Sequence, residues 1–385
     1  MKLFKSLLVA PATLGLLAPF SANATEVNFN AISNYSDEEI EIDINSFKPK
    51  SNQNLLLSGG EGLVDSQSHD GGFSETTTAS FSADFAIGAE DGVASHEAVA
   101  AGYGFQIDLS TSFTGEDSFD VSIDAGNAGS TSSTTFSALD ELDLNDGGDG
   151  LAVDGISYTF PLGDKTTVFV GDNMDGSTLY NTACVYGSPT DTMDDCGNYS
   201  SALAAGFGTA AGASFELGNG FTAAIGYEGE GSNKDGLLTK EGTDAYGGQL
   251  TYTADSYAAS VTYANIEGTD DTTYWALNGY WTPDSTGSVP SISVGYEMGD
   301  PTTAADTTQY FVGLQWDEVG PGTFGAAIGN TGPIDEGAEE TMMYEAFYSY
   351  PLNDSMTITP VVYVQETAGT ADDVTGVVVK TSFSF

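Results

Sequence analysis

The stretch YGFQIDLSTSFTGEDSFDVSIDA occupies residues 103–125. Apolar residues or threonine stand at every second position from Tyr103 to Phe113, and apolar residues do so again from Phe119 to Ala125. A period of two is typical of β-strands whose two faces meet different surroundings. The polar segment Thr114–Asp117 between the two runs contains a glycine and is short enough for a tight turn. This stretch therefore predicts two paired strands with one apolar and one polar face.

The same alternation returns along most of the chain. It is found at Thr76 to Ile87, Phe215 to Tyr227, Tyr257 to Tyr263, Ile292 to Tyr296, Tyr310 to Trp316 and Met356 to Val364. Alternation alone would also fit a soluble β-sandwich, whose strands bury one face against a second sheet. The lengths of the connections are therefore needed to choose between the two architectures.

Short and long connections follow one another in strict order. The short ones are at Thr114 to Asp117, Pro161 to Lys165, Gly218 to Gly220, Ala254 to Ser256, Pro283 to Val289, Glu318 to Gly322 and Pro351 to Asp354. The long, polar and acidic ones are at Gly126 to Gly150, Asp172 to Ser201, Gly229 to Thr243, Glu267 to Asp271, Gly299 to Thr307, Asn330 to Glu340 and Glu366 to Asp373. Such an order is typical of bacterial outer-membrane barrels, which have short periplasmic turns and long external loops.

Counting strands gives the size of the barrel. The seven short turns join fourteen strands, and one further strand lies at each end, at Thr76 to Ile87 and at Thr375 to Phe385. We therefore predict an all-β fold: a transmembrane antiparallel β-barrel of about 16 strands with both termini on the periplasmic side. Aromatic residues such as Phe113 and Phe119 flank most short turns, as in the interfacial girdle of such barrels. Sandwich core is the other interpretation of these rings.

The two ends of the chain carry different signals. Residues 1–24 have the pattern of an export signal, with Lys2 and Lys5 before an apolar stretch and Ala22-Asn23-Ala24 as the cleavage site. Residues 25–72 lack this long alternation; the acidic run from Asp37 to Ile44 could form a short strand, but an acidic periplasmic arm is the interpretation we favour. The barrel is expected over residues 73–385. No stretch after the signal is long and apolar enough for a membrane helix, so a bilayer could be crossed only by strands.

The charge excludes several functions. The chain has 56 acidic residues against eight lysines and no arginine, a net charge of −48 that becomes −50 when the two signal lysines are removed. Binding to nucleic acid or to an anionic membrane surface needs basic patches, so neither is expected. The only histidines, His69 and His96, are not placed with a nucleophile or with metal ligands. We therefore expect no enzyme, no cofactor and no metal centre.

One acidic segment has the composition of a cation-binding loop. Residues 143–150, DLNDGGDG, superficially resemble a calcium loop. The register of such a loop fails, because Gly147 takes the fifth position and Asp154 the twelfth. A flexible acidic loop is the interpretation we favour.

Two motifs resemble those of a known family. The stretch YTFPLGDKTTV at residues 158–168 is similar to one found in cyanobacterial outer-membrane porins, which are related to the carbohydrate-selective porins. The leader is also similar, and the last strand ends with outward apolar residues, Phe383 and a terminal Phe385, like the insertion signal read by the barrel-assembly machinery. The 25–72 segment is too short for the surface-layer-homology module that larger members carry. The resemblance implies a form that lacks this module.

The candidate site residues are acidic. Counted from the first strand, whose connection to the second strand is the first external loop, the segment from Asp172 is the third external loop, which in trimeric porins folds into the lumen; a plain surface loop is the alternative. The loop residues expected at a constriction are Asp172, Asp175, Asp191, Asp194 and Asp195. The residues expected on the lumen wall by their parity are Asp84, Asp108, Asp120, Asp124, Glu216, Glu228, Glu297 and Glu345. Cys184 and Cys196, close together in an exported chain, are expected to form a disulfide.

These observations lead to a functional hypothesis. We expect a porin in the cell outer membrane, which passes small hydrophilic solutes and ions by diffusion and prefers cations because rings of carboxylates favour them. Its expected partners are outer-membrane lipid, the barrel-assembly machinery and two further copies in a homotrimer. The alternative is a structural or receptor barrel that presents acidic loops without a general diffusion role. The solute itself is not predicted.

Overall fold

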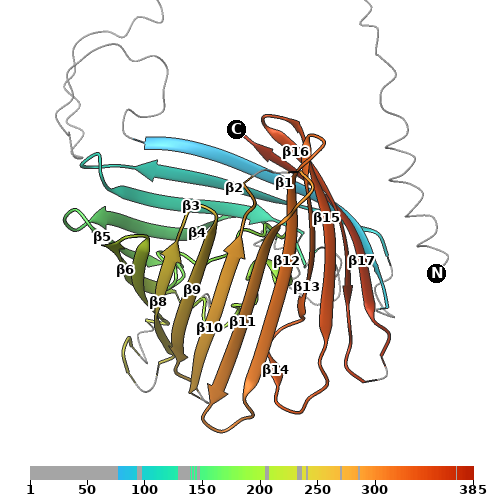
Figure 1. The fold of residues 1–385 in the computed structure, drawn as a ribbon. Helices are drawn as coiled ribbons and strands as arrows, with labels where there is room; N and C mark the ends of the chain where they lie inside the picture. The colour runs from blue at the N-terminus through green and yellow to red at the C-terminus, as the bar shows by residue number, and fades with distance from the viewer. Residues whose placement is uncertain are drawn as a thin grey trace, which may run out of the picture. The chain divides into compact units, whose positions relative to one another are not determined.

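The computed structural model describes residues 77–92, 98–128, 139, 141–142, 144, 148–203, 208–231, 236–239, 242–268, 271–284, 287–369 and 371–385. The expected signal and arm, both histidines and most of residues 143–147 lie outside these ranges. Among the described residues, no helix combines the length and the hydropathy needed to cross a bilayer. In the part of the chain that is described, nearly all of the regular secondary structure consists of antiparallel strands (Figure 1).

The strands follow one another around a single sheet. They are β1 (Thr77–Asp91), β2 (Ala100–Thr111), β3 (Ser118–Gly126), β4 (Gly148–Pro161), β5 (Thr166–Asp172), β6 (Thr209–Gly218), β7 (Phe221–Gly229), β8 (Asp244–Thr253), β9 (Tyr257–Ile266), β10 (Thr272–Trp281), β11 (Ser291–Pro301), β12 (Thr307–Val319), β13 (Gly322–Asn330), β14 (Ile334–Asp335), β15 (Met342–Asn353), β16 (Met356–Gln365) and β17 (Val374–Ser384). A four-residue helix, α4 (Asp191–Asp194), lies between β5 and β6.

The sheet closes on itself because β17 pairs with β1, with Phe383 opposite Ala83 and Val377 opposite Ala89. The short β14 pairs only with the first residues of β12, while β13 pairs directly with β15. The remaining 16 strands form the closed antiparallel barrel. The predicted fold class and strand number are therefore confirmed, and β14 is a small addition within a long connection.

All seven predicted short turns join consecutive strands at one end of the barrel. The tightest is between β6 and β7, where Gly218, Asn219 and Gly220 have φ angles of 85°, 54° and 84°. Glycine and asparagine adopt positive φ at low cost, which explains their use in this turn. The long connections begin and end at the opposite end. We refer to these as the turn end and the loop end of the barrel.

The two faces of each strand differ as the alternation predicts. On β11, Val294, Tyr296 and Met298 are exposed on the outside, whereas the intervening Ser293 and Glu297 are buried in the interior. An apolar outer face and a polar inner face are what a barrel in a bilayer requires.

Aromatic rings pair on the outer face near the turn end. Phe221 and Tyr252 lie with ring centroids 4.8 Å apart, and Trp316 and Phe324 with centroids 5.5 Å apart. Both pairs join neighbouring strands, and each ring lies within two residues of a short turn. The rings therefore occupy the outer face and are not part of a sandwich core.

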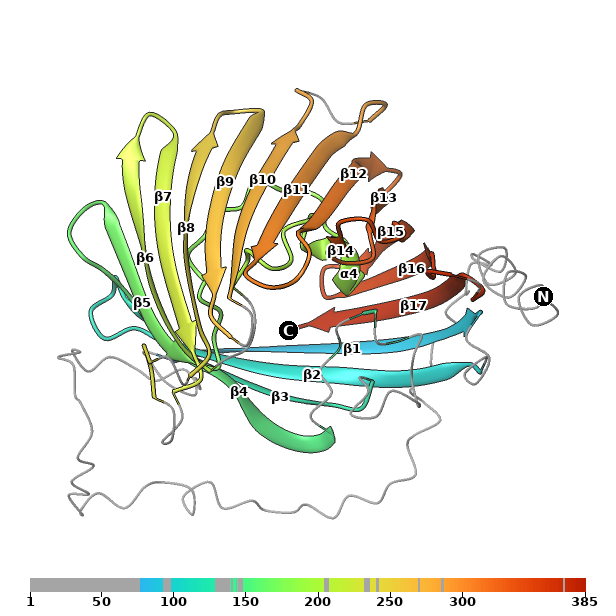
Figure 2. The ribbon, with the colours of Figure 1, turned by 90° about the horizontal axis from the view of Figure 1, so that it is seen from below.

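Described residues of two long connections lie inside the barrel. We call residues 127–147 loop 2 and residues 173–208 loop 3. Figure 2 shows α4 and the rest of loop 3 surrounded by the ring of strands. An apolar cluster packs Leu139 and Leu142 of loop 2 and Met193 of α4 against inward residues of the wall, such as Tyr363 and Val378. The main core of this chain therefore lies inside the barrel, toward β12–β17 and β1.

Candidate functional site

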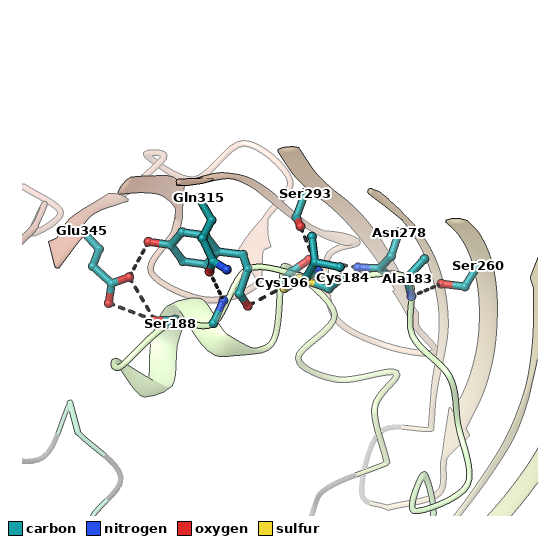
Figure 3. Close-up of a disulfide and its surroundings, with 12 residues drawn as sticks. Ala183, Cys184, Ser188, Cys196, Ser260, Asn278, Ser293, Gln315 and Glu345 are labelled. Atoms are coloured by element: carbon teal, nitrogen blue, oxygen red, sulfur yellow. Dashed lines mark hydrogen bonds between the residues drawn. A yellow bond between two sulfur atoms is a disulfide. The ribbon is translucent and has the colours of Figure 1, made fainter. Parts of the chain in front are cut away.

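Loop 3 runs along the inner wall of the barrel in an extended path. From residue 181 to residue 187, every second backbone N–H donates a hydrogen bond to an inward side chain of a different strand. Figure 3 shows the bonds to Ser260, Ser293 and Gln315. The pairs are Asn181 N to Gln249 Oε1 (2.6 Å, β8), Ala183 N to Ser260 Oγ (3.0 Å, β9), Val185 N to Ser293 Oγ (3.0 Å, β11) and Gly187 N to Gln315 Oε1 (3.0 Å, β12). The wall thus offers acceptors at the spacing at which an extended chain presents its donors.

The far end of this path is held by Glu345 of β15. Its carboxylate accepts hydrogen bonds from the hydroxyls of Tyr186 (2.7 Å), Ser188 (2.9 Å) and Thr190 (2.5 Å). The Tyr186 ring also packs against Phe311 and Phe347, with centroid distances of 5.5 and 5.7 Å. Glu345 is only 4% exposed, so its charge is balanced by these donors and not by bulk water.

Two further glutamates of the predicted wall set also lie beneath loop 3. Glu228 of β7 is fully buried and accepts a hydrogen bond from the backbone N–H of Gly176 (3.0 Å). Glu297 of β11, 2% exposed, accepts from the backbone N–H groups of Ser200 (3.1 Å) and Ser201 (2.7 Å). These carboxylates hold the loop to the wall, a role that their parity alone did not indicate.

The aspartates of the predicted wall set have a different environment. Asp84, Asp108, Asp120 and Asp124 lie on β1–β3 and are all partly exposed to solvent. Asp108 accepts hydrogen bonds from Gln106 Nε2 and from Ser122 Oγ, each at 2.7 Å. Loop 3 makes none of the hydrogen bonds that the structure gives these four side chains. Glu216, the last member of the set, is exposed near the turn end of β6.

The five loop aspartates fall into two groups. Asp172 and Asp175 lie where loop 3 leaves β5, and Asp172 Oδ1 accepts a hydrogen bond from Thr209 Oγ1 (3.1 Å). Asp191 and Asp194 belong to α4, and Asp195 ends it. The α4 group lies beside loop 2, because Asp191 N donates to the backbone oxygen of Glu141 (2.9 Å). The structure therefore does not gather all five residues at one point of the passage.

The disulfide between Cys184 and Cys196 is present, as predicted. It joins the outgoing, extended part of loop 3 to the segment that follows α4. The backbone oxygen of Cys196 also accepts a hydrogen bond from Asn278 Nδ2 of β10 (3.0 Å). The disulfide and the wall therefore hold the two arms of loop 3 together inside the barrel.

Loop 2 contributes to the same assembly, which the sequence analysis missed. Glu141 accepts hydrogen bonds from Gln365 Nε2 of β16 (2.5 Å) and from Thr192 Oγ1 of α4 (3.0 Å). Three leucines of this loop, Leu139, Leu142 and Leu144, are buried. The signal available in the sequence was the presence of regularly spaced leucines, such as Leu139 and Leu142, in an otherwise polar and acidic segment, which indicates that one side of the segment is buried.

Comparisons with known proteins agree with this architecture. No protein-family model matches the sequence, and no curated protein is significantly similar to it. Among solved structures, OprB of Pseudomonas putida aligns with a TM-score of 0.60 and 10% identity over 80% of this chain and 94% of that one. The anion-selective porin of Comamonas acidovorans aligns with a TM-score of 0.56 and 13% identity over 80% and 99%. A mutant of the Rh. blastica porin aligns with a TM-score of 0.50 and 13% identity over 80% and 100%.

These likenesses define the class of fold. At 10–13% identity they show a shared architecture and nothing finer. The chain has the 16-stranded antiparallel barrel fold that bacterial porins have.

Proposed function

We propose that this protein is an outer-membrane diffusion channel for small hydrophilic solutes. The observation that carries the proposal is the arrangement of the interior: loop 3 is bound to β7–β15, while inward polar residues of β1–β3 keep part of their surface accessible to solvent. Inward side chains on a closed barrel can be wet only if water enters the barrel. An apolar outer face and a wet inner face are the properties of a porin.

We further propose that the channel prefers cations. The register of β1–β3 sets four carboxylates on successive inward levels of the wall: Asp120 lies opposite Ser110, Asp108 opposite Ser122, Asp124 opposite Gln106, and Asp84 opposite Gly104. Inward levels on a strand are about 7 Å apart, so the carboxylates form a ladder along the direction of passage. Of the two lysines in the described residues, Lys165 lies in a short turn and only Lys380, on β17, shares this inner face.

The location, assembly and relatives that we propose rest on the resemblance of the sequence motifs to those of cyanobacterial outer-membrane porins. The cell outer membrane is the proposed location, a homotrimer the proposed assembly, and the cyanobacterial porins the proposed relatives. The α4 aspartates, Asp191, Asp194 and Asp195, are proposed to add to the negative potential of the passage.

A second candidate function is a receptor or structural barrel. It is favoured by the apolar cluster that loop 2 and loop 3 build inside the barrel, because such packing occupies part of the interior. The two candidates differ in whether ions pass.

Planar-bilayer recording of the purified protein tests both proposals. We expect discrete conductance steps and, under a KCl gradient, a reversal potential that indicates cation preference. The preference should weaken as salt rises, because the screening length falls from about 10 Å at 0.1 M to about 3 Å at 1 M. A folded barrel that gives no conductance would support the receptor candidate. Anion preference in dilute salt would contradict the electrostatic proposal.

A further inference from the structure

A three-residue pattern recurs on the strands beneath loop 3. A glycine and, two positions later, a glutamate or glutamine face the interior on four strands: Gly226 and Glu228 on β7, Gly247 and Gln249 on β8, Gly295 and Glu297 on β11, and Gly313 and Gln315 on β12. The side-chain oxygen of each glutamate or glutamine accepts a hydrogen bond from a backbone N–H of loop 3. The donors are Gly176, Asn181, Ser201 and Gly187, in the same order.

The glycines on β7 and β11 lie against backbone carbonyls of loop 3. A Cβ atom built on Gly226 would be 1.9 Å from the backbone oxygen of Gly176. A Cβ atom built on Gly295 would be 1.8 Å from the backbone oxygen of Cys196. Real Cβ atoms essentially never approach another heavy atom within 3.0 Å, so any larger residue would force the carbonyl to retreat by more than 1 Å.

The other two glycines lie against tyrosines of the loop. A Cβ atom on Gly313 would be 2.6 Å from Cγ of Tyr186, and one on Gly247 would be 2.9 Å from the hydroxyl of Tyr180. The Cβ atom of Gly247 would also be 2.4 Å from the backbone oxygen of Tyr263 on β9, so this position is restricted by the sheet as well. Gly226 and Gly295 are therefore the sites at which the backbone of the loop most clearly determines the residue.

The two members of each element have complementary effects. Residues two apart on a strand point to the same face, about 7 Å apart. The glutamate or glutamine attracts the loop by accepting a backbone donor, and the glycine leaves the strand backbone bare so that the loop can come close. If a larger residue replaced the glycine, its side chain would keep the loop backbone farther from the strand backbone, even with the hydrogen bond formed.

We propose that these four Gly-x-Glu/Gln elements are the docking site of loop 3 and that their glycines set its distance from the wall. The distance of the loop from β7–β12 determines how much of the barrel interior remains for passage. The residues of these elements therefore determine the width of the aperture, by which we mean the opening left between loop 3 and the opposite wall. Only this last step rests on the proposed channel function.

Single-channel conductance in high salt tests the aperture. Gly226→Ala and Gly295→Ala should each lower the conductance by at least about a fifth, because moving one wall inward by about 1 Å takes such a share from an opening of several ångströms. Gly279→Ala is the matched control: Gly279 lies on the outer face of β10, and a Cβ atom there would meet its nearest neighbour at 3.4 Å, an ordinary contact. Unchanged conductance in both inner variants would overturn the aperture step.

Hydrogen exchange of the loop amides tests docking independently of conduction. We expect the amides of Gly176, Asn181, Gly187 and Ser201 to be protected in the native protein, and the amide nearest each substitution to exchange at least about tenfold faster in the alanine variants. Unchanged exchange in both variants would overturn the docking proposal even if the protein conducts. Lost protection in a protein that does not conduct would support docking and contradict the channel function.

A variant without the loop covers the case in which the alanine variants fail to assemble. Residues 175–202 are replaced by a short Gly/Ser link, and Gly226→Ala and Gly295→Ala are introduced into that background. We expect normal assembly, since the carbonyl groups of Gly176 and Cys196 are then absent. Failure to assemble only when the alanines are present would mean that the strands themselves need these glycines, which would overturn the proposal.

Discussion

Glu345 on β15 and Asp108 on β2 occupy equivalent places in the alternating pattern, yet they belong to two unlike walls. On the docked wall, formed by the inner faces of β7–β12 and β15, Glu228, Glu297 and Glu345 are almost fully buried, and each accepts hydrogen bonds from loop 3. The acidic wall, formed by β1–β3, leaves Asp84, Asp108, Asp120 and Asp124 partly exposed, and Asp108 and Asp120 accept hydrogen bonds from neighbouring serine and glutamine side chains. The same inward carboxylate is therefore an anchor on one wall and a source of potential on the other.

The largest expected effect concerns the seam that closes the acidic wall. The backbone groups of Phe385 and Phe81 exchange two hydrogen bonds of 3.0 Å, and their rings stack with centroids 5.7 Å apart. Truncating Phe385, or replacing it with Asp, should abolish barrel assembly while export continues, because the last strand carries both the edge that closes the barrel and the proposed assembly signal. Surface labelling and gel mobility without boiling measure this. Ser384→Ala is the control, and normal surface levels of the truncated protein would contradict the prediction.

The second effect is on the docked wall. Glu345→Leu should destabilise the protein by at least about 3 kcal/mol, because three buried hydroxyl donors lose a charged acceptor. Glu345→Gln keeps one oxygen and should cost about 1 kcal/mol. Urea unfolding in detergent micelles measures both values. Equal stabilities for the two variants would show that the carboxylate does not anchor the loop.

The third effect is on ion selectivity, to which we expect the acidic wall to contribute more than the docked wall. Replacing Asp84, Asp108, Asp120 and Asp124 together with Asn should lower the cation-to-anion permeability ratio in dilute salt roughly tenfold, which corresponds to about 1.4 kcal/mol. Replacing Glu228, Glu297 and Glu345 with Gln should change the ratio less than about twofold, since buried and saturated charges are compensated locally. Reversal potentials decide between them. A larger effect from the glutamates would reverse the assignment of the walls.

The smallest effect is expected at Asp117, in the turn that joins β2 and β3. Burial opposes ionisation of this carboxyl, but hydrogen bonds from Thr114, Ser112 and Tyr158 outweigh it and hold the pKa of Asp117 well below its usual range. A lowered pKa stabilises the folded state above the ordinary pKa of 3.8, and this contribution is lost as pH falls toward the lower folded value.

Asp117→Asn tests this assignment. The variant should unfold at a lower temperature than the native protein at pH 7, and the difference should shrink as the pH falls below about 4. Thermal unfolding followed by circular dichroism at both pH values is the measurement. A difference that does not depend on pH would assign the effect to packing and not to charge.

The sequence predicts the strands, the seven turns and the number of strands because each of these depends on neighbouring residues. Alternation over ten residues reports the two faces of a strand, and a short glycine-rich link reports a turn. The environment of an inward residue is a different matter, since it depends on which distant segment covers it. Glu345 and Tyr186 are 159 residues apart, and nothing in the pattern around Glu345 distinguishes it from Asp108.

The loops illustrate the same limit. The order of the connections predicted that loop 3 could enter the barrel, and the spacing of Cys184 and Cys196 predicted their disulfide. The path of loop 3, its separation of the α4 aspartates from Asp172, and the entry of loop 2 all depend on contacts between segments far apart in the chain. The role of the Gly-x-Glu/Gln elements can likewise be recognised only when the position of loop 3 on them is known.

The path of loop 3 also has a consequence for the order of folding. Loop 3 is synthesised before all the strands of the docked wall, and its hydrogen-bond partners on that wall follow 52 to 159 residues later. Contacts so distant in the chain are slow to form, because the intervening segment must first be ordered. The disulfide, by contrast, closes a separation of only 12 residues and can form early. We therefore expect loop 3 to form its disulfide early and to dock on the wall in one of the last folding steps. Until it docks, the passage through a newly closed barrel is wider than in the mature protein.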